Sequence, residues 1–332
     1  MSNLPNIVIL ATGGTIAGIA GSTTTTIGYK AAAITVESLI EMVPEIEAIA
    51  NISGQQVVQI SSQDMNNEIW LTLGKRVNEL LSNPDVDGVV ITHGTDTMEE
   101  TAYYLHLVVS SKKPVVLVGA MRPSTAMSAD GPNNLYNAVV LAGSKSARRK
   151  GVLVVMNDTI YSAREVTKQS TFLTDAFQAP GLGALGYIQS NVAHFYKEPV
   201  GLHTVKSRFH TSDINELPKV DIAYGYANVT RVAIDAFVSH GSQGIIYAGT
   251  GNGSLTAEVT EALVEARRKG VIVVRSTRVG SGLVARNGEV NDDELDFVVS
   301  STLNPQKARV LLLLALTQTK DTKEIQQMFY DY

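Results

Sequence analysis

Runs of aliphatic residues that stop at polar or glycine-rich loops alternate along this chain with segments whose apolar residues recur at helical spacing. A short, unbroken aliphatic run suits a strand that is covered on both faces, and apolar residues three or four apart suit a helix with one buried face. The alternation predicts an α/β fold on a doubly wound, mostly parallel sheet.

The apolar pattern sets the bounds of the predicted elements. Strands are predicted at residues 7–12, 57–60, 88–92, 114–118, 152–156, 220–224, 244–248 and 271–275. Helices are predicted at residues 36–50, 68–81, 98–109, 134–144, 232–240, 256–269, 306–316 and 323–332. The alternation breaks only between residues 162 and 219, where a hairpin around 186–195 is expected.

This break divides the chain. We expect a larger N-terminal α/β domain over residues 1–195, a linker over 196–219 and a smaller C-terminal α/β domain over 220–332.

Two of the predicted strands deliver a threonine just past their carboxyl ends. Residues 7–18 (IVILATGGTIAG) lead to Thr15, and residues 88–97 (GVVITHGTDT) lead to Thr95 with Asp96 beside it. Ligands bind at this edge of open α/β sheets, and a hydroxyl held there is a candidate nucleophile. Either loop alone could be an ordinary turn, but the repetition favours a site built from neighbouring loops.

Three further segments could complete such a site. Residues 61–64 (SSQD) form another polar loop after a strand. Lys168 could serve Thr95 as a base, with Asp96 orienting its amine, although a lone lysine in a loop is more often a solvated surface residue. Residues 19–30 are rich in Gly, Ser and Thr and predict a mobile flap over the site, with Tyr29 near its far end.

Composition argues against several classes of protein. The net charge is −5, and the basic triplets at 148–150 and 267–269 suit helix ends better than nucleic acid. The chain has no cysteine and no HxxxH or HExxH spacing, so no metal site is expected. No segment approaches the ~20 apolar residues that cross a bilayer. The start, MSNLPN, lacks a secretory signal, which predicts a cytoplasmic protein, or a periplasmic one if a signal has been removed.

Two glycine-rich loops partly match a dinucleotide fingerprint. Residues 13–18 (GGTIAG) have Thr15 where the second glycine belongs, and residues 249–254 (GTGNGS) have Ser254 in place of the third. Neither ends in the Gly-Lys-Ser/Thr of a P-loop. These mismatches favour a protein without a cofactor, and a nucleotide-dependent enzyme remains an alternative.

Four segments together carry a family resemblance. They are ATGGTIAG at 11–18, ITHGTDTMEETA at 91–102, GAMRP with SADGP within 119–132, and LNPQKARVLL at 303–312. The chain resembles the bacterial-type L-asparaginases, with the closest likeness to the type II branch and its glutaminase-asparaginase relatives. The likeness extends from the first strand to Tyr332.

The resemblance implies roles for the loop residues of the N-terminal domain. Thr15 matches the primary nucleophile and Tyr29 the flap tyrosine that helps to activate it. Thr95, Asp96 and Lys168 match the second threonine with its lysine and aspartate. Substrate contacts are implied for Ser62 and Gln63 with the α-carboxylate, Asp96 with the α-ammonium, the Thr95 backbone N–H with the oxyanion, and the Ala120 carbonyl with the leaving amide.

The resemblance also implies an oligomer. Asn252 and Glu289 match residues that a neighbouring subunit contributes, so each site would be completed only in a homotetramer. Without the resemblance, Glu289 would read as part of a solvated acidic loop.

The expected function is hydrolysis of L-asparagine to L-aspartate and ammonia, with weaker action on L-glutamine and no cofactor. A glutaminase-asparaginase with comparable activity on both amides is the alternative. Ser254 resembles relatives with glutaminase activity, whereas residues 119–132 resemble the more asparagine-selective ones. A non-catalytic amino-acid-binding protein on the same scaffold is a third interpretation, although binding alone needs neither nucleophile nor base.

Overall fold

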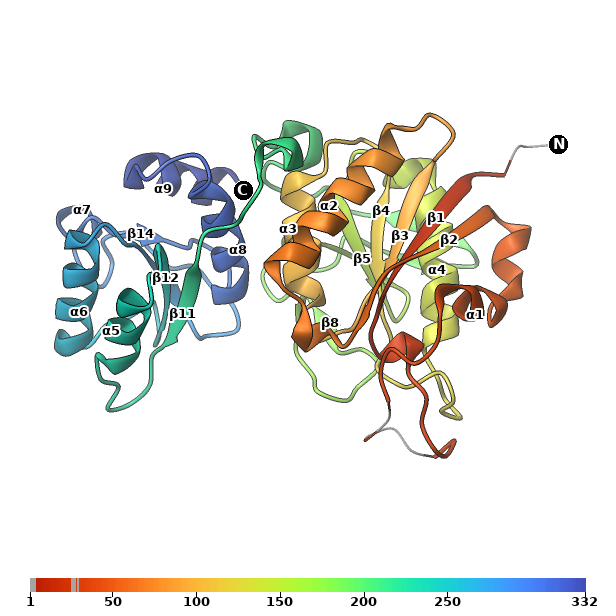
Figure 1. Ribbon diagram of the computed structural model, residues 1–332, viewed down its shortest axis with the longest axis horizontal. Coiled ribbons are helices and arrows are strands. Elements are labelled where there is room, and N and C mark those ends of the chain that lie inside the picture. The colour runs from red at the N-terminus through yellow and green to blue at the C-terminus, as the bar shows by residue number, and fades with distance from the viewer. Residues whose placement is uncertain (1–3, 25–27, 29) are drawn as a thin grey trace. The chain divides into compact units, whose positions relative to one another are not determined.

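The computed structural model describes residues 4–24, 28 and 30–332. Tyr29, expected on the flap, lies outside the described residues. The chain divides into two compact units, Met1–Asp213 and Ile214–Tyr332, each built on a sheet of its own (Figure 1). The division between Asp213 and Ile214 falls within the segment predicted as a linker.

The main sheet of the N-terminal unit has, among the described residues, eight strands in the order β10-β9-β6-β5-β4-β3-β1-β2. The edge strand β2 and the central strands β1, β3, β4 and β5 are parallel, and β6, β9 and β10 are antiparallel. The predicted α/β fold on a mostly parallel sheet is therefore confirmed. In chain order the strands are β1 Asn6–Gly13, β2 Asn51–Ile60, β3 Gly88–Thr92, β4 Val115–Val118, β5 Val152–Met156, β6 Thr159–Ser162, β9 Gly186–Gln189 and β10 Val192–Phe195.

The pairing register places the carboxyl ends of the central strands level with one another. Ala11 of β1 pairs with Thr92 of β3, and Thr92 pairs with Val118 of β4. The loops that carry Thr15, Thr95 and Ala120 therefore leave the sheet along the same edge.

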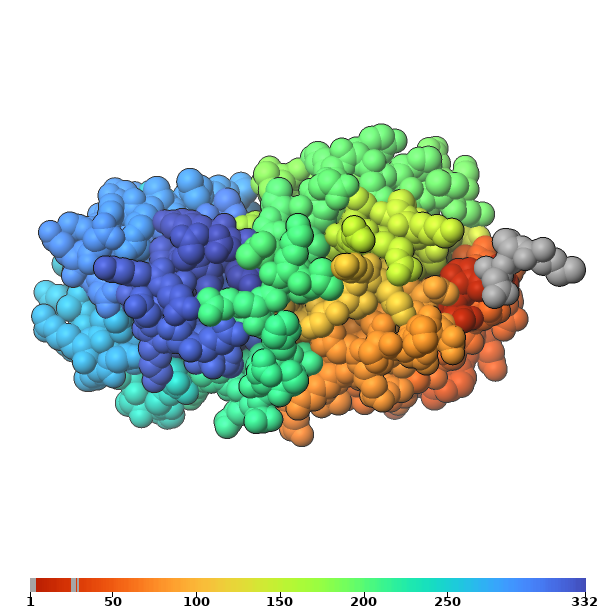
Figure 2. Space-filling model, turned by 90° about the horizontal axis from the view of Figure 1, so that it is seen from above, coloured from red at the N-terminus to blue at the C-terminus, as the bar shows by residue number. Residues whose placement is uncertain are grey.

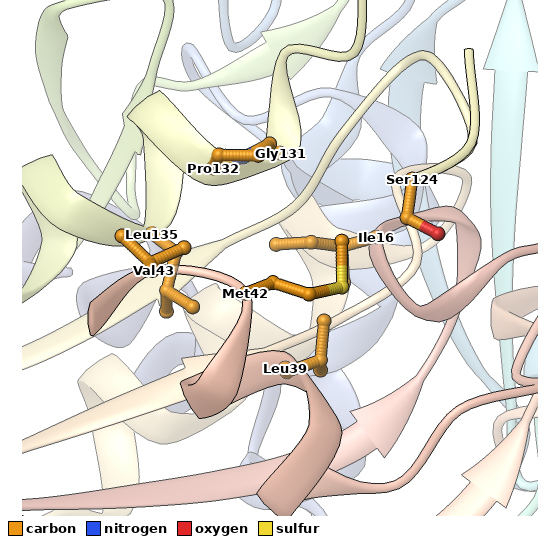
Figure 3. A pocket seen from close by; sticks show the side chains of 8 residues that line it. All are labelled: Ile16, Leu39, Met42, Val43, Ser124, Gly131, Pro132 and Leu135. Atoms are coloured by element: carbon orange, nitrogen blue, oxygen red, sulfur yellow. The ribbon is translucent and has the colours of Figure 1, made fainter.

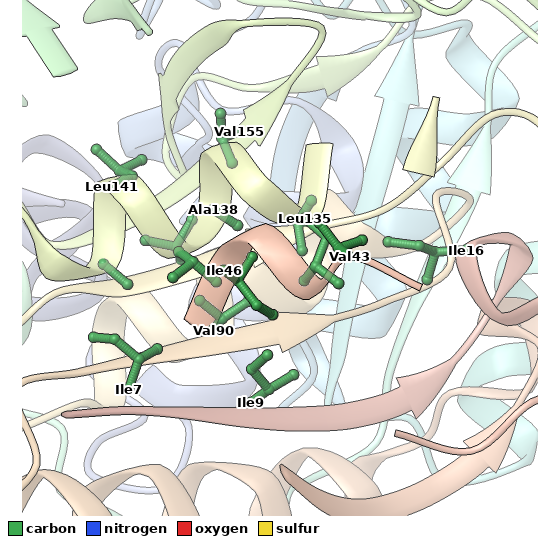
Figure 4. Close-up of a cluster of buried hydrophobic side chains, with 14 of the residues drawn as sticks. Ile7, Ile9, Ile16, Val43, Ile46, Val90, Leu135, Ala138, Leu141 and Val155 are labelled. Carbon is green, nitrogen blue, oxygen red and sulfur yellow. The ribbon is translucent and has the colours of Figure 1, made fainter. Parts of the chain in front are cut away.

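Four helices cover the two faces of this sheet, as Figure 1 shows for the described residues. The helices α2 (Asn67–Ser82) and α3 (Met98–Val108) pack together on one face, and α1 (Val36–Glu41) and α4 (Gly131–Gly143) lie on the other. On the second face the strand residues Ile7, Ile9 and Val90 meet helical side chains (Figure 4). Ile16 joins this core, so the residue after Thr15 is anchored by apolar packing.

The helix predicted over residues 36–50 is wrong in its extent. The helix α1 ends at Glu41, and a separate 3-10 turn covers Pro44–Ala48. Pro44 has no backbone N–H to continue the helix, and it disfavours a helical backbone at the preceding residue. Val43 accordingly has φ −135° and ψ 64°.

The strand predicted at 57–60 is longer than expected. It begins at Asn51, and its residues are at most partly buried because β2 lies at an edge of the sheet. The polar start of this strand (NISGQQ) therefore lacks the aliphatic run that marked the central strands.

Two hairpins extend the sheet at its other edge. The hairpin expected around 186–195 is confirmed, since β9 and β10 pair antiparallel across Ser190 and Asn191, which have φ values of 50° and 63°. The strand β6 was not predicted, although Asn157 and Asp158 have the same left-handed backbone between β5 and β6. The residues around this hairpin, light green in Figure 2, form part of the outer surface of the unit.

All residues of the C-terminal unit are described, and its sheet is parallel with the order β11-β12-β13-β14. The helices α5 and α6 pack on one face and α8 on the other (Figure 1). The short elements α7 and β14 were not predicted. The bounds are β11 Val220–Tyr224, α5 Val232–Ser239, β12 Gly244–Gly249, α6 Ala257–Arg268, β13 Ile272–Thr277, α7 Asp292–Leu295, β14 Val298–Val299, α8 Pro305–Ala315 and α9 Thr322–Asp331.

Candidate active site

Two glycines let three polar loops touch at the carboxyl edge of the N-terminal sheet. Gly14 has φ 82°, and a Cβ placed on it would lie 2.3 Å from the Cα of Gly94. A Cβ on Gly94 would lie 2.7 Å from the Oγ of Ser62. Only glycine allows this approach of backbone to backbone. The loops that carry Thr15, Thr95 and Ser62 are thus in direct contact.

Thr15 opens a 3-10 turn, Thr15–Ala17, and is 9% exposed. The turn is fixed on both sides, since Gly14 N donates to Ile60 O at 3.0 Å and Gly18 N donates to Thr15 O at 2.8 Å. The threonine predicted as nucleophile therefore has a rigid, almost buried setting.

Thr95, Asp96 and Lys168 meet as the sequence suggested. Lys168 Nζ donates to Thr95 Oγ1 at 2.8 Å and to Asp96 Oδ1 at 2.6 Å. Thr95 is buried, whereas the Asp96 side chain is 61% exposed. The exposed side of the aspartate leaves room for a cationic ligand, while the buried threonine faces the lysine.

A small sheet fixes the position of the lysine. Lys168 ends β7 (Thr167–Lys168), which pairs antiparallel with β8 (Phe177–Gln178), and Lys168 itself is opposite Phe177. Strand pairing limits the freedom of a long side chain at its backbone end. As an ammonium, Lys168 can stabilise negative charge on Thr95 Oγ1, and as a neutral amine it can accept the proton of that hydroxyl.

Ser62 and Gln63 lie in the 3-10 turn Ser62–Asp64, which follows β2. Ser62 is buried and links this turn to the Thr95 loop: its Oγ accepts a hydrogen bond from Asp96 N at 3.2 Å, and its carbonyl accepts one from Thr97 Oγ1 at 2.7 Å. Gln63 is exposed. The Ser62 side chain is therefore bound to the Thr95 loop, whereas the Gln63 side chain remains accessible.

Ala120 is fully buried in the loop that follows β4. Asp130, which the sequence analysis did not single out, shapes this loop by accepting from the backbone N–H groups of Met121 and Arg122, each at 2.9 Å. Gly119 keeps the loop against the second threonine, since a Cβ there would lie 3.1 Å from Thr95 Cγ2. Asp130 precedes α4 but makes no N-cap hydrogen bond to it, so the capping signal in SADGP does not reveal this contact with earlier residues.

His93 is a second residue that sequence reasoning missed. It is fully buried between β3 and the Thr95 loop, and its Nδ1 lies 2.6 Å from Gly94 O. A carbonyl only accepts, so Nδ1 carries the proton. Burial lowers the pKa of His93 to about 4, partly offset by this hydrogen bond. The ring is therefore neutral at physiological pH and holds the peptide that precedes Thr95.

In the C-terminal unit, Asn252 and Glu289 lie on two loops that contact each other. Asn252 Oδ1 accepts from Ala285 N at 2.9 Å, and Ser254 Oγ donates to Glu289 Oε2 at 3.0 Å. The Asn252 side chain thus holds the neighbouring loop, whereas Ser254 and the exposed Glu289 present their polar groups together.

An apolar pocket lies beside this edge of the sheet but does not include the threonine pair. It is lined by Ile16, Leu39, Met42, Val43, Ser124, Gly131, Pro132 and Leu135 (Figure 3). Its one side-chain hydroxyl, that of Ser124, donates to Gly18 O at 2.7 Å. The pocket is a packing gap between α1 and α4, and it offers a zwitterion no charged partner.

The described part of the chain contains no group of three or more His, Asp or Glu side chains that could hold a metal ion. Within the same residues, no helix has the length and apolar character needed to span a bilayer.

The fold and this cluster define a class of two-unit α/β proteins in which two threonine loops meet at the carboxyl edge of a parallel sheet. The chain belongs to the asparaginase family. The family model for the asparaginase N-terminal domain matches residues 6–201, and that for the glutaminase/asparaginase C-terminal domain matches residues 219–329. The resemblance drawn from the four sequence segments is therefore confirmed.

Similar proteins cover the whole chain. It is 53% identical to the glutaminase-asparaginase of Pseudomonas fluorescens biotype A over 332 residues, which are 100% of this chain and 91% of that protein. It is 53% identical to L-asparaginase 2 of Escherichia coli strain K12, over 99% of this chain and 94% of that protein. The crystal structure of the probable cytoplasmic L-asparaginase from Campylobacter jejuni matches with a TM-score of 0.96 and 51% identity, covering 99% of this chain and 100% of that one.

Proposed function

We propose that this protein hydrolyses the side-chain amide of L-asparagine to L-aspartate and ammonia, through a threonine nucleophile and an acyl-enzyme. The observation that carries the proposal is the position of Lys168, hydrogen-bonded to both Thr95 and Asp96 beside the Thr15 loop. A hydroxyl, a base and a group that orients the base are the parts a covalent hydrolase needs. Relatives named as asparaginases support the choice of substrate.

The loops suit a small zwitterion. The exposed Asp96 carboxylate matches the α-ammonium of the substrate, and Ser62 with Gln63 supplies neutral donors for its α-carboxylate. The Ala120 carbonyl is proposed to accept from the amide nitrogen. With these proposed contacts, the amide carbon would lie between the two threonine loops.

In the first half of the proposed reaction, Thr15 Oγ1 attacks the amide carbon, and the Thr95 backbone N–H donates to the oxyanion that develops. The C–N bond then breaks, and ammonia leaves with the proton lost by Thr15. Tyr29, which the resemblance matches to an activating tyrosine, is proposed to assist this proton transfer. In the second half, water loses a proton to Thr95 and Lys168 and attacks the ester. The C–O bond to Thr15 then breaks as that proton passes to Thr15 Oγ1, which releases L-aspartate and restores the Thr15 hydroxyl.

We further propose that Asn252, Ser254 and Glu289 act on the site of a neighbouring copy in a homotetramer. The Glu289 carboxylate is exposed and held by Ser254, so it can reach an α-ammonium outside its own unit. The expected linker over 196–219 would carry this unit as a separate domain.

A glutaminase-asparaginase of comparable activity on both amides is the second candidate. Ser254 favours it, because this residue resembles the one found in relatives with glutaminase activity. One methylene discriminates by only about 1–3 kcal/mol in a pocket, so the balance between the two amides depends on small differences.

The test is ammonia release by the purified protein from L-asparagine and, separately, L-glutamine, without added metal or nucleotide. Release at micromolar L-asparagine with poor use of L-glutamine supports the asparaginase. Comparable rates support the dual enzyme. Binding of L-asparagine without ammonia release would reject catalysis in favour of an amino-acid-binding protein, and activity that requires a nucleotide would reject the proposal of a cofactor-free enzyme.

A further inference from the structure

The C-terminal unit buries an ion pair completely. Arg275 in β13 and Asp292 at the start of α7 are both 0% exposed, and they form two parallel hydrogen bonds, Nε to Oδ1 at 2.6 Å and Nη2 to Oδ2 at 2.7 Å. This bidentate geometry fixes the guanidinium plane.

The remaining donors of Arg275 go to two loops. Nη1 donates to the carbonyls of Asn252 and Gly253, each at 3.1 Å, and Nη2 donates to Ala285 O at 3.0 Å. A guanidinium has five N–H groups, and here each has an acceptor. Asp292 Oδ2 also accepts from Asn287 N at 2.7 Å, so the carboxylate holds the second loop as well.

The two loops are those that carry Ser254 and Glu289. The first spans residues 249–254 and the second residues 284–292, and the bond between Ser254 Oγ and Glu289 Oε2 joins their polar ends. Gly253, with φ 75°, allows the first loop to approach, since a Cβ there would lie 3.0 Å from Arg275 Nη1. Glycine at this position therefore belongs to the same arrangement.

Stability alone is a weak explanation for this pair. Burying two charges costs several kcal/mol in desolvation per ion, and well-packed apolar residues of similar size are often as stable. An apolar pair could fill the same volume, but it could not make the four hydrogen bonds that join the ion pair to the backbone of the two loops. The ion pair instead fixes the position of Ser254 relative to Glu289.

We propose that Arg275 is a positioning residue which, with Asp292, holds Glu289 and Ser254 in the geometry that binds the α-ammonium end of the substrate. This inference rests on the proposed function. It assigns Arg275 no contact with the substrate, so its loss weakens substrate binding through Glu289 while the Thr15, Thr95 and Lys168 cluster of the N-terminal unit is unchanged.

The test compares Arg275→Lys and Asp292→Asn with the unmodified chain, each measured for kcat, for KM with L-asparagine and for Tm. Lysine at position 275 keeps the positive charge but lacks the planar guanidinium that forms two parallel hydrogen bonds. Asparagine at position 292 keeps the shape of aspartate but lacks its charge. Because the two variants disturb the pair differently, at least one is expected to fold. We expect KM to rise at least about tenfold, with kcat changing less than about threefold.

A matched control is Arg267→Lys, because Arg267 also pairs with an aspartate and two carbonyls, Asp296 O and Val271 O, away from these loops. It is expected to lower Tm without raising KM. The decisive comparison repeats Arg275→Lys in a Glu289→Gln background, where the rise in KM should disappear because the positioned group is gone.

Two outcomes overturn the inference alone: an unchanged KM in folded Arg275→Lys and Asp292→Asn, or the same fold rise in KM with and without Glu289. Failure of the unmodified chain to release ammonia would overturn the proposed function, and the inference with it.

Discussion

At the scale of single residues, the two threonines differ in what surrounds them. Thr95 faces an amine held by a carboxylate, whereas Thr15 sits in a turn fixed by backbone hydrogen bonds and by the packing of Ile16. This asymmetry suits a division of labour, with Thr15 attacking and Thr95 relaying protons.

Thr15→Val should abolish this attack while preserving the fold, since valine has the same shape. We expect kcat to fall by at least about 10³-fold with a Tm close to that of the unmodified chain. Thr12→Val is the matched control, because Thr12 is also buried and donates only to Thr92 O in the same strand pair, at 2.9 Å. Near-normal turnover by Thr15→Val would exclude it as the nucleophile.

His93 predicts a pH dependence of stability. Its folded pKa of about 4 lies below the ordinary value of 6.5, so the unfolded chain binds a proton first as pH falls. Stability is therefore full above about pH 6.5 and is lost towards pH 4, by up to about 3 kcal/mol. Burial also lowers the pKa of His203, which contributes in the same direction.

The measurement is urea unfolding at pH 7 and at pH 4.5 for the unmodified chain and for His93→Asn. The variant should be less stable at pH 7 but lose less stability on acidification. His194→Asn, on the exposed surface of β10, is the control and should retain the original pH dependence. Parallel losses in all three proteins would contradict the assignment to His93.

At the scale of elements, strand ends and glycines set the distances within the site. Gly14→Ala would place a Cβ 2.3 Å from Gly94 Cα at a backbone φ of 82°, which strains the turn and pushes the two threonine loops apart. We expect a loss of about 1–3 kcal/mol in stability and a fall in kcat of about 10²-fold or more.

Ammonia release and thermal melting check this prediction together. Gly181→Ala is the control, because a Cβ there meets nothing within 4 Å and should change stability by less than about 0.5 kcal/mol. Retained activity in Gly14→Ala would mean that the contact between the loops is not required.

Sequence periodicity could predict the central strands and most helices because each follows a local rule of burial. The periodicity predicted a helix that continues to residue 50, whereas Pro44 ends it. The periodicity also missed β6, because the Asn157–Asp158 turn before this strand carries little apolar signal. The meeting of the Thr15 and Thr95 loops was predictable since strand ends of a parallel sheet meet at one edge, whereas that rule does not apply to Lys168, which lies on the separate sheet of β7 and β8. The roles of Asp130, His93 and Arg275 were not predictable, because their partners are brought to them only by tertiary packing.

At the scale of the whole molecule, the proposed tetramer predicts complementation, at low L-asparagine, between a chain that lacks the nucleophile and a chain that binds the substrate weakly. Thr15→Val retains Glu289, and Glu289→Ala retains Thr15. If Glu289 serves a neighbouring copy, refolding the two variants together should create sites that carry both residues, at most about a quarter of all sites for random pairing.

Ammonia release by the mixture, compared with each variant refolded alone, checks this prediction. A mixture no more active than its parts would show that Thr15 and Glu289 must belong to one chain. Sedimentation of the same samples establishes whether mixed oligomers have formed.

The strand order has a consequence for the timing of folding. Thr15 and Thr95 follow β1 and β3, and Lys168 lies on β7, so their loops come together only after strands far apart in the chain have paired. Such non-local pairing forms slowly compared with helices. A newly made chain would therefore acquire helical content well before its site is assembled.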